Sequence, residues 1–230
     1  MLASQLGFWS LVALVLVGAY LLGAIPWSLV VGKRFYGIDP REHGSGNLGA
    51  TNVFRVLGAR AGGATLVLDA GKGALAVGLA KLLVSSQAFG VTAADWVAVG
   101  AMAASVLGHA YSPYIGFKGG KGVATSAGAL AVMTPLGLVI ELAVFAAVIA
   151  TSRIVSLGSV VVAITYPILV LMMYPDSLPT IVTVFALAAL VLWRHRTNIV
   201  RIVRGEENKL SFSRRGAARS DEAESSDKEQ

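Results

Sequence analysis

The residues that could do chemistry lie in four polar stretches of an otherwise apolar chain. These stretches are GSGNLGATNVFR (residues 44–55), GFKGGKGVAT (116–125), TSRIVSLGS (151–159) and RHRTNIVRIVRGEENK (194–209). Glycine exposes backbone N–H groups and nearby Arg or Lys adds positive charge, so such combinations bind phosphate oxygens. In KGGKG the start of the following helix adds a further partial positive charge. The pattern therefore predicts a site for a phosphate-containing anion.

Several better-known motifs do not fit these residues. GSGNLG (44–49) has the spacing of a dinucleotide fingerprint and Asp69 follows at a suitable distance, but no strand precedes it and Asp69 falls in an apolar run. GGKGVAT lacks the spacing of a P-loop. None of His43, His109 and His195 is followed by Asp at the fifth position, the signature of many acyl-CoA acyltransferases. The chain has no Cys, and we expect neither a metal nor a cofactor.

The composition indicates a membrane protein with several spans. The 230 residues are 55% hydrophobic and 14% charged, with a mean hydropathy of +0.70, and many apolar runs are long. The net charge of +6 is concentrated beside these runs and near the C-terminus, where anionic lipid headgroups are the expected partners. We expect membrane lipids as partners, no nucleic acid, and no obligate protein partner.

The expected fold is all-α, a polytopic membrane protein with about seven transmembrane helices, some of them short. We assign spans to approximately 8–31, 61–84, 96–111, 157–174 and 180–193, together with two short crossings within 123–150. The two crossings follow from Thr134 and Pro135, because a residue before proline is driven out of the helical region. A single crossing there would also place Arg153 and the cations of 193–196 outside, against the positive-inside rule.

The charges also predict an orientation and a domain boundary. The first cations, Lys33 and Arg34, follow the first apolar run, so the N-terminus is expected outside and the four polar stretches inside. Residues 1–205 are expected to form a single integral-membrane domain. Residues 206–230 are rich in Ser, Lys, Arg and Glu, and we expect a disordered cytoplasmic tail there.

In this order and spacing, the polar stretches resemble the bacterial acyl-phosphate:glycerol-3-phosphate acyltransferases. The resemblance is carried by GSGNLGATNVFR, FKGGKGVAT, RIVSLGS and RHRTNIVRIVRGEENK, and it covers about residues 15–210. It implies seven helices in the bacterial cytoplasmic (inner) membrane with the active site on the cytoplasmic face. It further implies transfer of a fatty acyl group from acyl phosphate to glycerol 3-phosphate. The products are lysophosphatidic acid and phosphate, in the first acylation step of phospholipid synthesis.

The resemblance also assigns roles to residues. The catalytic positions are Ser45, Arg55, Lys121 and His195, the substrate-binding positions are Asn47, Thr51, Asn52, Lys118, Gly119, Gly120, Gly122, Ser156 and Asn198, and Glu207 is structural. Which of Lys118 and Lys121 contacts which phosphate stays open. The sequence GEENK at 205–209 differs from the GTEPK typical of the family, a difference confined to the local turn.

The chemistry that this family performs agrees with the residues present. Acyl phosphate has a good leaving group, so the site needs mainly to neutralise two phosphates and align a hydroxyl with a carbonyl. Glycerol 3-phosphate is largely dianionic at neutral pH, because a phosphate monoester has a second pKa of about 6. Its own phosphate could accept the hydroxyl proton, and His195 is the alternative base.

A phosphate or phosphate-ester transporter is the alternative function. Asp69 and Lys72 lie three residues apart in one span; we expect a buried ion pair there, but the two could instead line a transport path. Transporters often show two related halves, and this sequence shows no such repeat. Acyl-CoA-dependent transfer is a third possibility, disfavoured by the missing histidine–aspartate signature.

Overall fold

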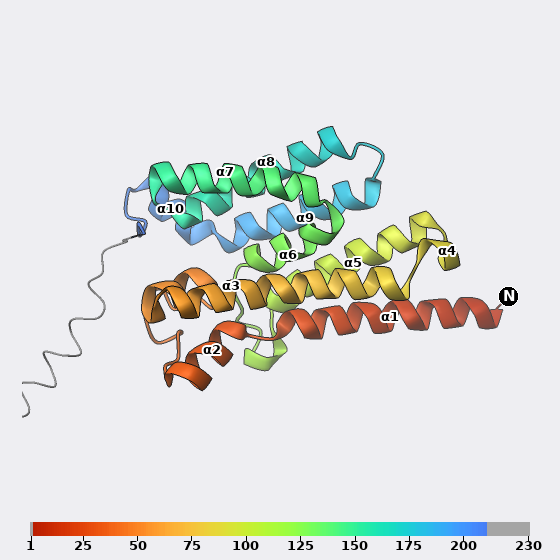
Figure 1. Cartoon of the computed structure of the whole chain (residues 1–230), viewed down its shortest axis with the longest axis horizontal. Coiled ribbons are helices and arrows are strands. Elements are labelled where there is room, and N and C mark those ends of the chain that lie inside the picture. Colours follow the sequence, from red (N-terminus) through yellow and green to blue (C-terminus); the bar gives the residue numbers. More distant parts are fainter. Residues whose placement is uncertain (1, 211–230) are drawn as a thin grey trace, which may run out of the picture.

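The computed structural model describes residues 2–210, and this part of the chain is built from helices joined by loops (Figure 1). The elements are α1 (Leu2–Ala24), α2 (Trp27–Tyr36), α3 (Ala50–Leu83), α4 (Ser86–Phe89), α5 (Val91–Ala110), the 3-10 turn η1 (Pro113–Ile115), α6 (Val123–Met133), α7 (Pro135–Ser152), α8 (Val155–Met173), α9 (Leu178–Arg194) and α10 (Arg196–Val203). The all-α prediction is confirmed for the described residues.

Four of the described helices are long and apolar enough, by length and composition, to cross a membrane. They lie in Gln5–Ala24, Val91–Ile115, Pro135–Ser152 and Val155–Met173. The pair α9 and α10, bent by 60° relative to each other, makes a fifth candidate. Reaching seven spans also requires α6, a shorter apolar helix, and α3, which carries buried charges. The number of spans and their orientation therefore stay predictions.

Large apolar side chains point outward from this bundle. Leu82 and Met172, for example, are 75% and 76% exposed. The helices approach one another through small residues instead: a Cβ atom on Gly23 would overlap the backbone of Ser105 in α5, and one on Gly128 would overlap Ala70 in α3. Close contacts through glycine and apolar outer surfaces are typical of helices packed in a bilayer.

The first apolar run differs from the expected single span over 8–31. α1 ends at Ala24 and α2 begins at Trp27, because Pro26 lacks an N–H and restricts the residue before it. The carbonyl of Ile25 is consequently free of the helix ladder, and it accepts a hydrogen bond from Lys72 Nζ at 2.8 Å. The break thus supplies a partner for a charge that is buried in α3.

α3 begins at Ala50, well before the span expected to start near residue 61, and it bends three residues after the first polar stretch ends. Gly58 has φ 84° and ψ −177° inside the helix, a conformation that glycine adopts at little cost. A Cβ atom on Gly62 would overlap the backbone of Phe54, so the segments on either side of the bend lie against each other. This bend fixes the place of Arg55, which comes just before it.

The break expected at Thr134 and Pro135 is present: α6 ends at Met133 and α7 begins at Pro135. α7, α8 and α9 then lie side by side, with α10 at one end of the group (Figure 1). The chain after α10 packs back onto this group, because the N–H of Leu210 donates to the carbonyl of Arg153 at 2.7 Å. Of the expected tail, residues 211–230 lie outside the described residues.

Candidate active site

A cavity of about 660 Å³ brings members of all four polar stretches together. Predicted site residues that line it are Ser45, Asn47, Thr51, Asn52, Arg55, Lys121, Gly122, Ser156, His195, Asn198 and Glu207. The rest of its wall is mainly apolar and comes from α6, α7, α8 and α9, through side chains such as Leu130, Phe145 and Leu187. The composition of this wall suits an anion at the cationic end and an apolar group at the other.

Asn52 organises the first polar stretch. It is 2% exposed, and its Nδ2 donates to the carbonyls of Pro40 at 2.8 Å and His43 at 3.2 Å. Its Oδ1 accepts hydrogen bonds from Ser45 N at 2.8 Å and Ser45 Oγ at 3.1 Å. The Asn52 side chain was predicted to bind substrate, but its amide forms hydrogen bonds to other residues of the protein. These bonds position Ser45 at the edge of the cavity.

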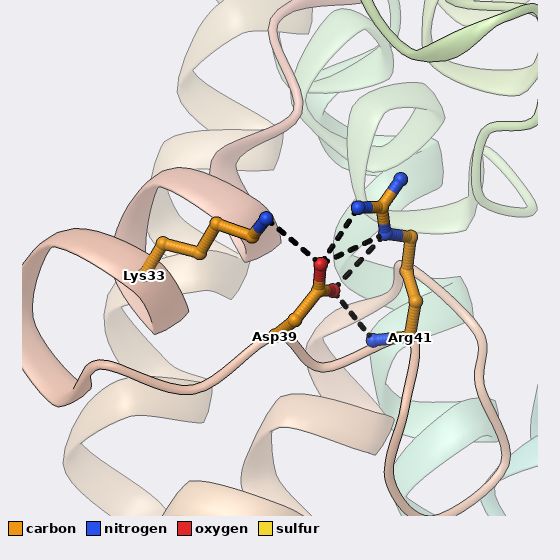
Figure 2. Close-up of polar contacts among 3 residues, drawn as sticks. All are labelled: Lys33, Asp39 and Arg41. Atoms are coloured by element: carbon orange, nitrogen blue, oxygen red, sulfur yellow. Dashed lines mark hydrogen bonds and ion pairs between the residues drawn. The ribbon is translucent and has the colours of Figure 1, made fainter.

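An ion cluster fixes the start of the same loop (Figure 2). The Asp39 carboxylate lies 2.9 Å from Lys33 Nζ in α2 and 2.6 Å from Arg41 Nη2, and it accepts the N–H of Arg41 at 3.0 Å. The hydrogen bond from the Arg41 side chain, which outweighs burial, holds the pKa of Asp39 below its usual range. This cluster was not predicted from the sequence, although an acidic residue between two cations beside the first polar stretch could have indicated it.

The glycine loop differs from the phosphate-binding loop expected from the sequence. The N–H groups of Gly119 and Gly120 already donate, at 3.1 Å each, to the carbonyls of Ala110 and His109, so they are not free for a phosphate. These two glycines do not line the main cavity, and they line a cavity of about 10 Å³ behind the loop. Lys118 is exposed and does not line the main cavity. Lys121 and Gly122 are the residues of this stretch that line it.

Buried charges hold the loop from behind. Lys72 Nζ lies 2.8 Å from Asp69 Oδ1 and 3.0 Å from His109 Nδ1, so the expected Asp69–Lys72 pair is confirmed and extends to His109. A Cβ atom on Gly120 would overlap the ring of His109. Glycine is therefore required at position 120 because a histidine ring occupies the adjacent space.

A hydrogen-bonded chain links Lys121 to the third and fourth stretches. Lys121 Nζ donates to Asn198 Oδ1 at 2.6 Å, and Asn198 Nδ2 donates to Glu207 Oε1 at 2.7 Å. The Glu207 carboxylate also accepts from Ser156 Oγ at 3.0 Å and Arg201 Nε at 2.8 Å. Burial raises the pKa of Glu207, but these hydrogen bonds outweigh it and keep the pKa below its usual value. Glu207 therefore joins three segments, as its predicted structural role requires.

Lys121 and His195, which both line the cavity, have lowered pKa values. Burial, with added repulsion from neighbouring arginines, lowers the pKa of Lys121 to about 8. Burial and the nearby Lys121 ammonium lower the pKa of His195 to about 4. His195 Nδ1 lies 2.8 Å from the carbonyl of Val191, which can only accept, so we assign the ring proton to Nδ1. Neutral His195 then has Nε2 as its hydrogen-bond acceptor.

Comparison with known proteins agrees with this geometry. The sequence profile of the glycerol-3-phosphate acyltransferase family matches residues 13–205. This chain belongs to that family. A glycerol-3-phosphate acyltransferase of Geobacillus kaustophilus is 47% identical over 200 residues, covering 87% of this chain and 96% of the relative. One from Listeria monocytogenes is 43% identical over 194 residues, covering 84% and 94%.

Solved structures of the family have the same fold. Crystal structures of PlsY (YgiH), an integral membrane glycerol 3-phosphate acyltransferase, match with TM-scores of 0.79 for its glycerol 3-phosphate form and 0.77 for its lysophosphatidic acid form. Both are 34% identical and cover 87% of this chain, and the match covers 96% and 95% of those chains. Together with the apolar outer surfaces of the helices, this identifies the acyltransferase described here as a membrane protein.

Two arginines of this acyltransferase were not assigned a role from the sequence. Arg194 Nη2 donates to the carbonyl of Gly119 at 2.6 Å, and its Nε donates to that of Gly120 at 3.0 Å. Arg201 holds Glu207, as described above. Both arginines line the cavity. The repeated arginines in RHRTNIVRIVR could have indicated both residues, but only His195 and Asn198 of this segment were assigned a role from the sequence.

Proposed function

We propose that this protein transfers a fatty acyl group from acyl phosphate to glycerol 3-phosphate, giving lysophosphatidic acid and inorganic phosphate. Membership of the glycerol-3-phosphate acyltransferase family supports acylation of glycerol 3-phosphate. The observation that carries the proposal is one cavity with a cationic end and an apolar end. Such a cavity suits a substrate pair with two phosphates and one long acyl chain.

The cationic end can neutralise both phosphates. The cavity is lined there by the cations Arg55, Lys121, Arg194 and Arg201. Arg55 has no ion-pair partner among residues 2–210, so its guanidinium is available for a phosphate. Arginine binds phosphate through two parallel hydrogen bonds, which also orients the bound group.

In the proposed reaction, a hydroxyl oxygen of glycerol 3-phosphate attacks the carbonyl carbon of acyl phosphate. The new C–O ester bond forms as the bond from the carbonyl carbon to the phosphate oxygen breaks, and that oxygen leaves with the electron pair. The hydroxyl proton passes to a base and then to the released phosphate. The protein contributes alignment of the two substrates and stabilisation of negative charge.

We propose the phosphate of glycerol 3-phosphate as the base. Its second pKa is about 6, whereas the pKa of His195 is lowered to about 4, so the phosphate accepts a proton more readily near neutral pH. His195 Nε2 then serves as a hydrogen-bond acceptor that holds a substrate hydroxyl. The neutral form of His195 suits this role, because an imidazolium would have no acceptor.

We further propose that the enzyme lies in the bacterial cytoplasmic membrane with this site on the cytoplasmic face. The four polar stretches carry most of the cations that flank the apolar runs, and such cations favour the cytoplasmic side. Water-soluble glycerol 3-phosphate would reach the cavity from that side. The lipid product would leave into the bilayer.

The test uses purified protein in lipid vesicles with glycerol 3-phosphate and either acyl phosphate or acyl-CoA. We expect lysophosphatidic acid and an equal amount of phosphate with acyl phosphate, and no product with acyl-CoA. Product from acyl-CoA alone, or from neither donor, would contradict the proposed donor. Uptake of glycerol 3-phosphate into the vesicles without acylation would instead support the transporter.

A further inference from the structure

A carboxyl group lies in the mainly apolar part of the cavity. Glu141 of α7 is 5% exposed and lines the cavity with Leu138, Leu142 and Phe145. Its Oε2 accepts a hydrogen bond from Thr165 Oγ1 of α8 at 2.9 Å. Within residues 2–210 the carboxyl group has no cation partner and no other hydrogen bond. The reaction proposed above gives this group no role.

Glu141 is distant from the residues at the cationic end of the cavity, which we propose bind the substrate phosphates. Thr165 comes nine residues after Ser156 in α8, which corresponds to about 14 Å at about 1.5 Å per residue. Val184 lines the cavity in α9, eleven residues before His195, which corresponds to about 16 Å. Glu141 therefore lies well along the cavity from the cationic end, on the path of a long acyl chain.

Neighbouring hydroxyl groups make this part of the wall more polar still. Tyr166 of α8 lines the cavity, and its hydroxyl is hydrogen-bonded to Thr134 Oγ1 at the junction of α6 and α7. Thr165 Oγ1 lies 3.0 Å from the carbonyl of Val161 as well as close to Glu141. The polar wall is thus held by contacts between α7 and α8, so the carboxyl group does not depend on a mobile segment.

A polar group in a bilayer is costly unless it has partners or reaches water. While the cavity holds water, the second oxygen of Glu141 can be hydrated. A hydrocarbon chain that extends past Glu141 would displace this water and offer no hydrogen bond in return. A chain that ends short of Glu141 would leave the hydration intact.

We propose that Glu141, positioned by Thr165, determines which acyl chains the enzyme accepts. It disfavours saturated chains long enough to cover its carboxyl group, relative to shorter chains or chains with a hydroxyl group near their end. This inference rests on the proposed function, because it takes the apolar part of the cavity as the site of the acyl chain.

The test is a competition between pairs of saturated acyl phosphates of different length in the same vesicles, since the product ratio gives the ratio of their kcat/KM values. We compare wild type with Glu141→Met, Glu141→Leu and Glu141→Gln. Both apolar variants should favour the longer chain by about tenfold more than wild type does. Glu141→Gln keeps a polar group and should retain the wild-type ratio. Val139→Leu is the matched control, because Val139 lies on the same helix and is 62% exposed.

A second arm uses an acyl phosphate with a hydroxyl group near the end of its chain, in competition with the unsubstituted chain of equal length. Wild type should favour the hydroxylated chain, and Glu141→Met should reverse the preference. Thermal unfolding and size-exclusion profiles check that each variant is folded. If Glu141→Met does not fold, Glu141→Leu replaces it in this comparison.

Three results would overturn parts of this reasoning. Active apolar variants with the wild-type chain preference would overturn the role of Glu141 while leaving the proposed function intact. The same conclusion follows if Glu141→Gln shifts the preference as strongly as Glu141→Met. If wild type forms no product from any acyl phosphate, the proposed donor fails and this inference fails with it.

Discussion

We expect the activity to fall at alkaline pH because Lys121 loses its proton, and replacing Lys121 with arginine should remove this fall. Because burial lowers the pKa of Lys121 to about 8, the free enzyme loses this positive charge as the pH rises through that value. One pH unit above the pKa, roughly one lysine in eleven stays protonated, so kcat/KM should fall about tenfold. Arginine stays protonated throughout this range, so the alkaline limb should disappear in Lys121→Arg.

The assay measures kcat/KM for glycerol 3-phosphate across the pH range, with spontaneous hydrolysis of acyl phosphate subtracted at each pH. Lys121→Arg can have a lower kcat/KM at every pH, because arginine is larger than lysine. The test concerns the shape of the pH profile and not the absolute value of kcat/KM. Lys118→Arg is the matched control, since Lys118 is exposed and does not line the main cavity, and it should keep the wild-type limb. An alkaline limb near 8 that persists in Lys121→Arg would refute the assignment.

The acid limb of the same profile tests the base. If the phosphate of glycerol 3-phosphate accepts the proton, kcat/KM should fall as the pH drops below about 6, the second pKa of a phosphate monoester. His195→Gln should keep this limb while raising the KM for glycerol 3-phosphate. A His195→Gln variant with normal KM, a much lower kcat and no acid limb would identify His195 as the base instead.

The remaining predictions concern binding, packing and topology. Arg55→Ala should lower kcat/KM about a thousandfold, because it removes a charge-assisted contact to phosphate; near-normal turnover of the folded variant would show that Arg55 does not contact the reacting phosphates. Gly120→Ala should lower Tm by several degrees as well as activity, since its new methyl group would overlap the ring of His109; an unchanged Tm would contradict the packing. A cysteine at position 153 in this otherwise cysteine-free chain should resist an impermeant thiol reagent in intact cells, and labelling there would contradict the proposed orientation.

The features that the sequence predicted correctly are local or compositional. The break at Thr134 and Pro135 follows from proline geometry alone. The Asp69–Lys72 pair follows from helical spacing, because residues three apart share one face. The four polar stretches meet at one cavity. Their shared pattern of cations beside apolar runs predicted this, because it places all four on the same side of the membrane.

The features that the sequence did not predict depend on contacts between distant segments. KGGKG has the composition of a phosphate-binding loop, but the N–H groups of Gly119 and Gly120 donate to the carbonyls of Ala110 and His109. Local glycine content indicates where backbone is accessible to a partner, and it does not identify the partner. From the sequence we expected one span over 8–31, whereas the chain breaks at Pro26 between α1 and α2. The hydrogen bond from Lys72 to the Ile25 carbonyl depends on the packing of α3 against this break.

These long-range contacts also set the balance of charge in the proposed active site. Four cations line the cationic end of the cavity, and the Glu207 carboxylate accepts a hydrogen bond from one of them, Arg201. Through Asn198 this carboxylate orients Lys121 without pairing with it directly, so the lysine charge is left for a ligand. The remaining positive charge also opposes protonation of His195. Two bound substrate phosphates would neutralise the positive charge that the carboxylates of the protein leave unbalanced.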